Sequence, residues 1–448
     1  MAWYETAVFY HVYPLGLCGC PHENDGQNQD CFDQLFVWAN HMKNMNCTAI
    51  YIGPLFQSGS HGYDTTDYYQ VDCRLGNNER MKQWVAHCHN MGMRVVVDGV
   101  FNHVGRDFFA FRDLKENREQ SRYRDWFCNV NFQSNNEYND GFSYDNWGGY
   151  NLLVKLNLRN PEVKEYLFGA VSLWIHEFEI DGIRLDSANV LDWDFMKELR
   201  SRCDQMKSEF WLMGEVIHGD YSRYINPSML DSVTNYELHK GLYSGHNDHN
   251  YFEIAHSVRR LNDLCRGMRL YTFSDNHDVP RLASKLNNRV HQPLIAMLVY
   301  TLPGIPSIYY GSEYGIEGKQ ENGDDWLLRP ALDLSDFSEQ EKDTKSLVSL
   351  YKKLGQLKKE YLQLSYGSYQ ELLLTNRQFG FARILDNRAI ITLLNNDDAP
   401  AHLEVNCPVA TNKIVDLLEK GFTSNLSEGK LRVDLPANEG MILGVFAD

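Results

Sequence analysis

The sequence contains no apolar run long enough to cross a membrane, and its first 15 residues lack the basic segment and apolar core of a secretion signal. We therefore expect a cytoplasmic protein with no membrane partner. Positive charge is scarce, because 43 Lys and Arg stand against 60 Asp and Glu, a formal net charge of −17. Such an acidic chain is repelled by phosphate backbones, which argues against nucleic acid as a partner.

Other absences exclude further classes of chemistry. No Gly-rich loop opens a helix after a strand, which argues against kinases and dinucleotide enzymes. The ten cysteines are scattered and fit no zinc-ligand spacing, so free thiols are the expected state. Cys18, Cys20 and Cys31 share one loop, and the sequence leaves their role open. No activated Ser or Cys is evident, which disfavours acyl transfer.

The sequence contains enough hydrophobic residues to form a large core. A chain of 448 residues with 43% hydrophobic content suits a large α/β domain and a smaller one. Short runs rich in β-branched and aromatic residues recur, and amphipathic helical stretches separate most of them, which predicts a (β/α)8 TIM barrel. The eight runs lie at 8–15, 48–55, 93–102, 182–188, 210–216, 232–236, 269–278 and 306–313.

Two regions depart from this alternation. A polar, aromatic stretch rich in Asn, Asp and Gly follows the third strand, which predicts a small inserted subdomain at 104–159. Short strands with regular turns dominate the C-terminal part, which predicts an antiparallel β-sandwich domain at 366–448. The barrel is then expected at 1–103 and 160–365.

Charged side chains gather where the predicted barrel strands end. The carboxyl ends of barrel strands form the active site in such folds, so these residues are expected to converge. Carboxylates together with His, Arg and Tyr suit glycosidic bond cleavage, in which one carboxylate attacks and one carboxylic acid protonates the leaving oxygen. Asp181 precedes its strand, and we expect it to cap a turn or helix. The converging set comprises Asp98, Asn102, His103, Arg184, Asp186, Glu215, Asn276, His277 and Asp278.

Four segments resemble the four sequence regions of the α-amylase family of glycoside hydrolases. They are DGVFNHVG (98–105), GIRLDSANV (182–190), WLMGEVIH (211–218) and FSDNHD (273–278). The resemblance covers about residues 7–365 and continues into the C-terminal domain. Within the family the chain looks most like the neopullulanase, cyclomaltodextrinase and maltogenic amylase group. Because the first barrel strand is expected at about residue 8, we expect the N-terminal β domain usual in that group to be missing.

The resemblance implies the catalytic roles. Asp186 would be the nucleophile, Glu215 the general acid and base, and Asp278 the third carboxylate that supports the transition state. Arg184, two residues before Asp186, is expected to face it and to lower its pKa. Substrate contact or support of the site is implied for Tyr63, His103, Arg184, His277, Asp325 and Arg329, with Asp98 and Asn102 behind them. A plain surface ion pair is the alternative for Asp325 and Arg329.

The implied activity is that of a retaining α-glucan hydrolase. It would cleave α-1,4 bonds in maltooligosaccharides, maltodextrins or cyclodextrins through a covalent β-glycosyl-enzyme. Open alternatives are an α-glucan transglycosylase of the 4-α-glucanotransferase type, an α-1,6 or other α-linkage glucosidase, and a catalytically inactive sugar-binding protein. The expected partner is a small oligosaccharide, and the oligomeric state stays open.

The chemistry requires no cofactor, but a structural calcium ion is an open question. Asn102 matches a calcium ligand of many α-amylases. The oxygen-rich loop 23–30 adds Asp25, Asn28 and Asp30 as candidate ligands, and a solvated polar loop is the alternative.

Overall fold

Eight parallel strands close into a barrel, as the sequence predicts. Each strand pairs with the next in parallel, and a bridge between Thr234 and Tyr271 closes the ring. This computed structural model describes residues 1–265, 267–411 and 413–446. The barrel strands are β1 (Phe9–Val12), β2 (Ala49–Ile52), β5 (Arg94–Gly99), β9 (Gly182–Leu185), β10 (Trp211–Gly214), β11 (Ser232–Val233), β12 (Tyr271–Phe273) and β13 (Ile305–Tyr309).

The barrel strands are buried on both faces. Along β5, Val96 belongs to the cluster that fills the barrel, whereas Val95 and Val97 belong to the large core outside it. Phe9 and Trp211 stack inside the barrel with ring centroids 4.9 Å apart. A strand between a filled interior and a layer of helices needs apolar side chains on both sides, which explains the continuous apolar runs.

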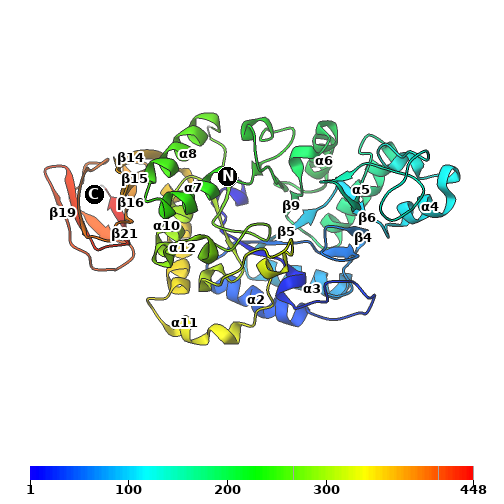
Figure 1. Cartoon of the computed structure of the whole chain (residues 1–448). Coiled ribbons are helices and arrows are strands. Elements are labelled where there is room, and N and C mark those ends of the chain that lie inside the picture. The colour runs from blue at the N-terminus through cyan, green and yellow to red at the C-terminus, as the bar shows by residue number, and fades with distance from the viewer. Residues whose placement is uncertain (266, 412, 447–448) are drawn as a thin grey trace.

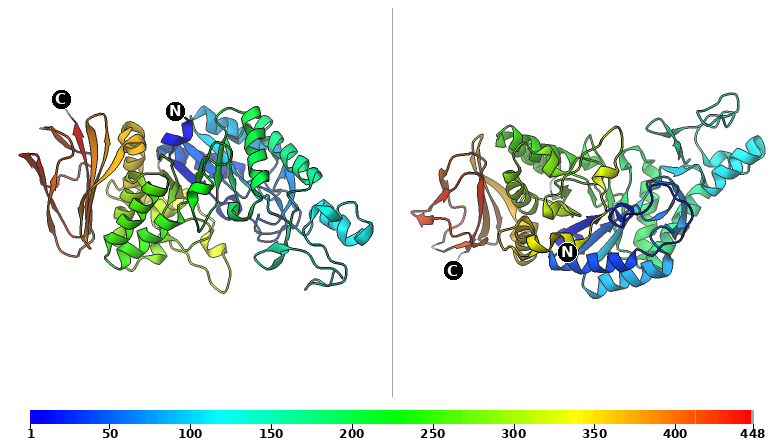
Figure 2. Two further views of the ribbon diagram at one scale, coloured as in Figure 1. Left: turned by 90° about the horizontal axis from the view of Figure 1, so that it is seen from above. Right: turned by 60° about the horizontal axis from the view of Figure 1, so that its bottom comes forward.

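Helices cover the outside of the barrel (Figures 1 and 2). The four stretches with the clearest helical periodicity form α2 (Phe32–Asn44), α3 (Asn78–Asn90), α5 (Pro161–His176) and α6 (Trp193–Met206). Three of these helices begin with a side-chain cap, because Asn77, Asn160 and Asp192 accept hydrogen bonds from N–H groups in the first turns of α3, α5 and α6. The remaining barrel helices are α1 (Pro14–Leu17), α7 (Tyr236–Asn247), α8 (Tyr251–Leu264), α9 (Leu282–Lys285), α10 (Gln292–Thr301), α11 (Ser338–Lys342), α12 (Leu347–Glu360) and α13 (Gln363–Tyr366).

Two small sheets lie outside the barrel wall. Within the predicted insert, β6 (His103–Gly105), β7 (Asn146–Trp147) and β8 (Tyr150–Lys155) pair antiparallel, and α4 (Phe109–Asn117) packs nearby. The insert forms the end of the molecule opposite the C-terminal domain (Figure 1). A second hairpin, β3 (Phe56–Ser58) with β4 (Thr65–Val71), follows β2 and was not expected.

The C-terminal part forms two antiparallel sheets around a core of their own. Ile391 and Leu443 of one sheet share this core with Leu403 and Leu431 of the other. One sheet contains β14 (Ser368–Leu374), β15 (Gln378–Leu385), β16 (Arg388–Asn395), β21 (Glu439–Phe446) and β18 (Ile414–Asp416), and the other β17 (Ala401–Asn406), β20 (Lys430–Leu435) and β19 (Ser424–Ser427). Residues 412, 447 and 448 of the predicted domain lie outside the described residues. Among the described helices, all are too short or too polar to cross a bilayer.

Asp181 joins several elements instead of capping a turn or helix. It lies directly before β9 and is 1% exposed. Its carboxylate contacts His89 at 2.7 Å, Arg94 at 3.0 Å and Lys207 at 3.0 Å, and it accepts the Val95 N–H at 2.9 Å. Burial raises the pKa of Asp181, but His89, Lys207 and the Val95 N–H outweigh it, so the pKa lies below its ordinary value.

Replacing Asp181 with Ala should lower the free energy of unfolding by about 2–3 kcal/mol at neutral pH, because charge-assisted hydrogen bonds are lost and the Val95 N–H is left unpaired. Since the folded-state pKa is lowered, this contribution is complete above about pH 4 and disappears as the pH falls through the folded value. Urea titrations at several pH values measure it, with Asp25→Ala in an exposed loop as the control. Equal losses for both variants would contradict this account.

Candidate active site

A cavity of about 1310 Å³ opens at the carboxyl ends of the barrel strands. Asp186 follows β9, Glu215 follows β10, and Asp278 lies five residues beyond the end of β12. All three of these predicted carboxylates line the cavity, and Tyr63 and His103 do so as well. The barrel thus brings together side chains from distant parts of the chain, as expected for this fold.

One guanidinium holds three carboxylates beneath this cavity. Arg184 Nη1 contacts Asp98 Oδ1 at 2.8 Å and Asp186 Oδ1 at 2.9 Å, and Arg184 Nη2 contacts Glu215 Oε2 at 3.0 Å. The Arg184 side chain is 3% exposed. The predicted contact between Arg184 and Asp186 is therefore present, and it is part of a larger cluster.

Arg184 lowers the pKa of Asp186, as expected, but the net shift is upward. Burial raises this pKa well above its ordinary range, and the charges of Glu215 and Asp98 act in the same direction. Arg184 opposes them without overcoming them. A single cation cannot compensate three buried carboxylates, so the cluster favours keeping a proton.

Glu215 is held through both of its oxygens. Oε2 accepts the Ser187 N–H at 2.9 Å in addition to its contact with Arg184, and Oε1 accepts the Tyr236 hydroxyl at 3.4 Å. Ser187 has a left-handed backbone, with φ of 47° and ψ of 43°. This uncommon conformation ends the strand directly after Asp186 and turns the Ser187 N–H toward Glu215.

Asp278 has cationic or polar partners at both oxygens. Its Oδ2 lies 2.9 Å from His277 Nε2, and its Oδ1 lies 3.2 Å from Arg329 Nη2. Its N–H donates to the Asn276 side chain at 2.9 Å. Burial raises the pKa of Asp278, but His277 and Arg329 outweigh burial, so the pKa lies well below its ordinary value. Asp278 is therefore ionised at neutral pH.

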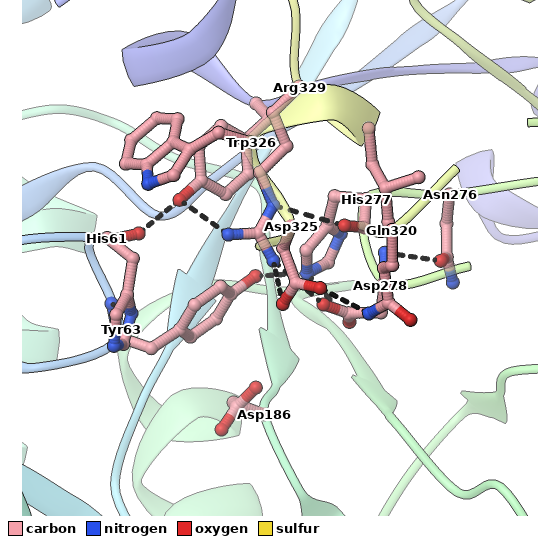
Figure 3. A network of polar contacts seen from close by, with 12 residues as sticks. His61, Tyr63, Asp186, Asn276, His277, Asp278, Gln320, Asp325, Trp326 and Arg329 are labelled. Carbon is pink, nitrogen blue, oxygen red and sulfur yellow. Dashed lines mark hydrogen bonds and ion pairs between the residues drawn. The ribbon is translucent and has the colours of Figure 1, made fainter. Parts of the chain in front are cut away.

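Arg329 belongs to this network and not to a plain surface ion pair. It is 5% exposed, its Nε donates to the His277 carbonyl at 3.1 Å, and its guanidinium lies 4.6 Å from the ring centre of Tyr13. Asp325 is its weaker partner, at 3.5 Å. Figure 3 shows the guanidinium directed at Asp278 and Asp325 together. Arg329 thus links the segment after β13 to the carboxylate of Asp278.

Tyr63 comes from the turn of the unexpected hairpin between β3 and β4. Its hydroxyl donates to Asp98 Oδ2 at 3.0 Å and also contacts His277 Nε2, and its ring stacks on the His277 ring with centroids 5.4 Å apart. Asp98 additionally accepts the Tyr51 hydroxyl at 2.7 Å. Asp98 thereby ties Tyr63 to Arg184, which agrees with its predicted supporting position.

His103 is a neutral hydrogen-bond donor facing the cavity. Burial lowers its pKa to about 3, so it carries no charge at neutral pH. Asn102 donates to its Nδ1 at 3.2 Å, which places the single ring proton on Nε2. Among the described residues, this buried Nε2 has no partner, so it is free for a ligand oxygen.

The calcium candidates are not brought together as a ligand set. The Asn102 amide is directed at His103, Asp25 accepts the Gln27 N–H at 3.0 Å, and Asp30 pairs with the cation of Arg80 at 2.9 Å. Asn28 is exposed in the same loop. Among the described residues, no three His, Cys, Asp or Glu side chains form a metal-binding group. These side chains therefore form no preassembled ligand group, calcium binding stays a prediction, and no chemical step depends on it.

Sequence reasoning missed several residues at the site. His11 in β1 is 2% exposed and stacks on Tyr51 at 4.2 Å, and its position in an apolar run was a usable signal. Trp147 and Tyr150 line the cavity while 38% and 63% exposed. Tyr236 carried no signal, because only the fold brings it to Glu215.

Two of the three cysteines of one loop contact a single carbonyl oxygen. The sulfur atoms of Cys20 and Cys31 are 3.9 Å apart, and both lie within 3.4 Å of the Arg74 carbonyl oxygen. Cys18 follows α1 in the same loop, and all ten cysteines of the chain are free thiols. No disulfide among these ten cysteines therefore constrains the site.

A TIM barrel whose strand ends carry three carboxylates around a buried guanidinium defines a glycoside hydrolase. A family model described as the catalytic domain of alpha amylase matches residues 39–330, and the chain belongs to the α-amylase family.

Relatives within that family agree with the group that the sequence motifs resemble. A cyclomaltodextrinase of Thermoanaerobacter pseudethanolicus is 30% identical, with 95% of this chain and 76% of the relative covered. Neopullulanase 2 of Thermoactinomyces vulgaris is 29% identical, with 98% and 78% covered. Among solved structures, a cyclomaltodextrinase superimposes with a TM-score of 0.88 at 26% identity, covering 99% of this chain and 78% of that one. A debranching enzyme of Nostoc punctiforme does so with a TM-score of 0.84 at 28% identity, covering 99% of both chains.

Replacing Arg329 with Met should raise the pKa of Asp278, because one of the cations that keep this carboxylate ionised is lost. An NMR titration of carboxyl carbons measures the change. Asp325→Asn is the matched control, since it leaves the contact between Arg329 and Asp278 in place. An unchanged Asp278 titration in the Arg329 variant would contradict the assigned network.

Proposed function

We propose that the chain is a retaining α-glucan hydrolase that cleaves α-1,4-glucosidic bonds in maltooligosaccharides, maltodextrins or cyclodextrins. The observation that carries this proposal is the shared contact of Asp186 and Glu215 with the guanidinium of Arg184. Retaining glycosidases place their two carboxyl groups about 5–5.5 Å apart, whereas inverting enzymes need about 6.5–9.5 Å for a water molecule. Two carboxyls held by one guanidinium support the shorter separation.

In the first step, Asp186 attacks the anomeric carbon and Glu215 protonates the leaving oxygen, which produces a covalent β-glycosyl-enzyme. In the second step, Glu215 takes a proton from water, and this water releases the sugar with its configuration retained. This mechanism requires Glu215 as the acid and Asp186 as the anion before the attack. The cation of Arg184 lowers the pKa of Asp186 and so favours its ionised form, against the burial that raises it.

The remaining residues bind the sugar and its developing charge. Ionised Asp278 places negative charge beside the oxocarbenium-like transition state. The free Nε2–H of His103 faces a hydroxyl of the bound sugar, and Tyr63 supplies a flat surface for its apolar face. His277 is buried outside the cavity lining, and its Nε2 contacts Tyr63 and Asp278, so it supports these two side chains. Asp325 and Arg329 border the cavity on the Asp278 side and are proposed to bind the next sugar.

The shape of the cavity supports a substrate of several sugar units. Its volume exceeds the range of about 300–1,000 Å³ that is usual for small-ligand sites. It extends from Trp326 past the three carboxylates to His256 on α8. The exposed rings of Trp147 and Tyr150 at its rim suit contact with sugar faces.

The names of relatives support the same substrate class and a cytoplasmic location. Cyclomaltodextrinases, a neopullulanase and maltogenic amylases all match this chain. Two Bacillus subtilis relatives, each 29% identical, are named intracellular maltogenic amylase. We propose accordingly that the chain acts on small oligosaccharides in the cytoplasm. Structural calcium stays an expectation from the resemblance alone.

An α-1,6 specificity is the second candidate, because a debranching enzyme of known structure matches 99% of both chains at 28% identity. Incubation with maltotriose, maltoheptaose, β-cyclodextrin and pullulan separates the candidates. Proton NMR reads the anomeric form of the first products. Initial α-anomers from the linear sugars support the main proposal, cleavage restricted to pullulan supports the second, and initial β-anomers contradict both. Products longer than the substrate would assign a transglycosylase.

Asp186→Asn should lower kcat on maltotriose by more than about 10⁴-fold, because the nucleophile is lost while the shape of the side chain is kept. Glu215→Gln should lower kcat by about 10²–10⁴-fold on maltotriose, and by less on an aryl α-maltoside whose leaving group needs no proton. Asp194→Asn, with its carboxylate 91% exposed, is the control. Near-normal turnover by Asp186→Asn would rule out its role as nucleophile.

A further inference from the structure

A chain of hydrogen bonds connects the segment of Asp278 to Glu215. The Asp278 N–H donates to Asn276 Oδ1 at 2.9 Å. Asn276 Nδ2 then donates to the Tyr236 hydroxyl oxygen at 2.9 Å, and this hydroxyl lies 3.4 Å from Glu215 Oε1. The direction of every bond is determined, because an N–H can only donate and the amide oxygen of Asn276 is already used as the acceptor.

The hydrogen-bond partners of Tyr236 determine where its hydroxyl hydrogen points. Its oxygen accepts from Asn276, so its single hydrogen is free to point at Glu215 Oε1. The other oxygen of Glu215 already faces two donors, the Ser187 N–H and Arg184. A proton on Oε2 would point at these two donors, which is unfavourable. The proton of the acid form must therefore sit on Oε1, the oxygen beside Tyr236.

The surroundings hold the Tyr236 ring in this position. Tyr236 is the first residue of α7, directly after Asn235, whose side chain accepts the Leu238 N–H at 3.0 Å and begins the helix. The ring packs edge-on against Phe273, with centroids 5.1 Å apart. It is 9% exposed, and it lines the cavity. The hydroxyl therefore has a fixed place beside the oxygen that transfers the proton.

We propose that Tyr236 is a positioning residue for the general acid and base. This inference rests on the proposed function. With Glu215 protonated on Oε1, Tyr236 defines which oxygen faces the leaving group. Once the proton has moved to the leaving oxygen, the Tyr236 O–H stabilises the carboxylate that remains on Oε1. Tyr236 thereby favours proton release in the first step, and Asn276 fixes the direction of its O–H.

The test is Tyr236→Phe, which keeps the ring and removes the hydroxyl. Because a hydrogen bond to a charged group is lost, kcat on maltotriose should fall about 10- to 100-fold, with KM changed far less. The basic limb of the kcat/KM profile should move to higher pH, since the ionised form of the acid loses a donor. The loss should be smaller on an aryl α-maltoside with a good leaving group.

Tyr271→Phe is the matched control. It removes another buried tyrosine hydroxyl of the same barrel cluster, one that bonds to Ser307 at 2.6 Å and not to Glu215. A pH profile in Tyr236→Phe equal to that of Tyr271→Phe would overturn the inference. Asn276→Ala is the second variant if Tyr236→Phe does not fold, and it should move the basic limb in the same direction.

A readout without turnover separates this inference from the proposed function. The carboxyl carbon of Glu215 can be titrated by NMR in the wild type and in Tyr236→Phe. Its titration midpoint should be higher in the variant, whatever the substrate proves to be, because a donor to the carboxylate is missing. If the wild type cleaves none of the glucans, the proposed function fails. If the midpoint does not change, the inference about Tyr236 fails.

Discussion

The site depends on one buried guanidinium. Arg184 contacts Asp98 in β5, Asp186 directly after β9 and Glu215 directly after β10, at 2.8–3.0 Å. Without this cation, three carboxylates could not share one buried site, because an unpaired buried charge costs several kcal/mol, roughly. With it, the cluster is still short of positive charge and retains a proton. The same shortage raises the pKa of Asp186 well above its ordinary range.

The barrel places this cluster beside a cavity in which the carboxylates have different electrostatic surroundings. A tightly filled interior, with Phe9 against Trp211, leaves the carboxyl ends of the strands as the place where charged side chains reach water and a ligand. Asp278 lies in a different electrostatic setting from Asp186, since His277 and Arg329 keep it ionised. The two carboxylates therefore differ in how readily they keep a negative charge.

Some contacts in the site follow from the local geometry of one strand, and others depend on distant segments. Arg184 and Asp186 are two positions apart, so their common face follows from strand geometry alone. Arg329 and Asp325 are four apart, and a plain surface ion pair was the alternative to a role in substrate binding, yet the closer partner of Arg329 is Asp278 from another segment. The sign of the Asp186 pKa also escaped prediction, because it depends on burial and on charges that are distant in sequence.

The sequence by itself determined the eight strands, the helices around them and the three carboxylates at the strand ends. Apolar periodicity and residue type are local properties, and a barrel places every strand end at one face. Only the tertiary structure decided that the hairpin after β2 delivers Tyr63, that Asn102 is directed at His103, and that Tyr236 touches Glu215. Those contacts join segments whose spacing along the chain carries no periodic signal, so packing alone determines which side chains meet.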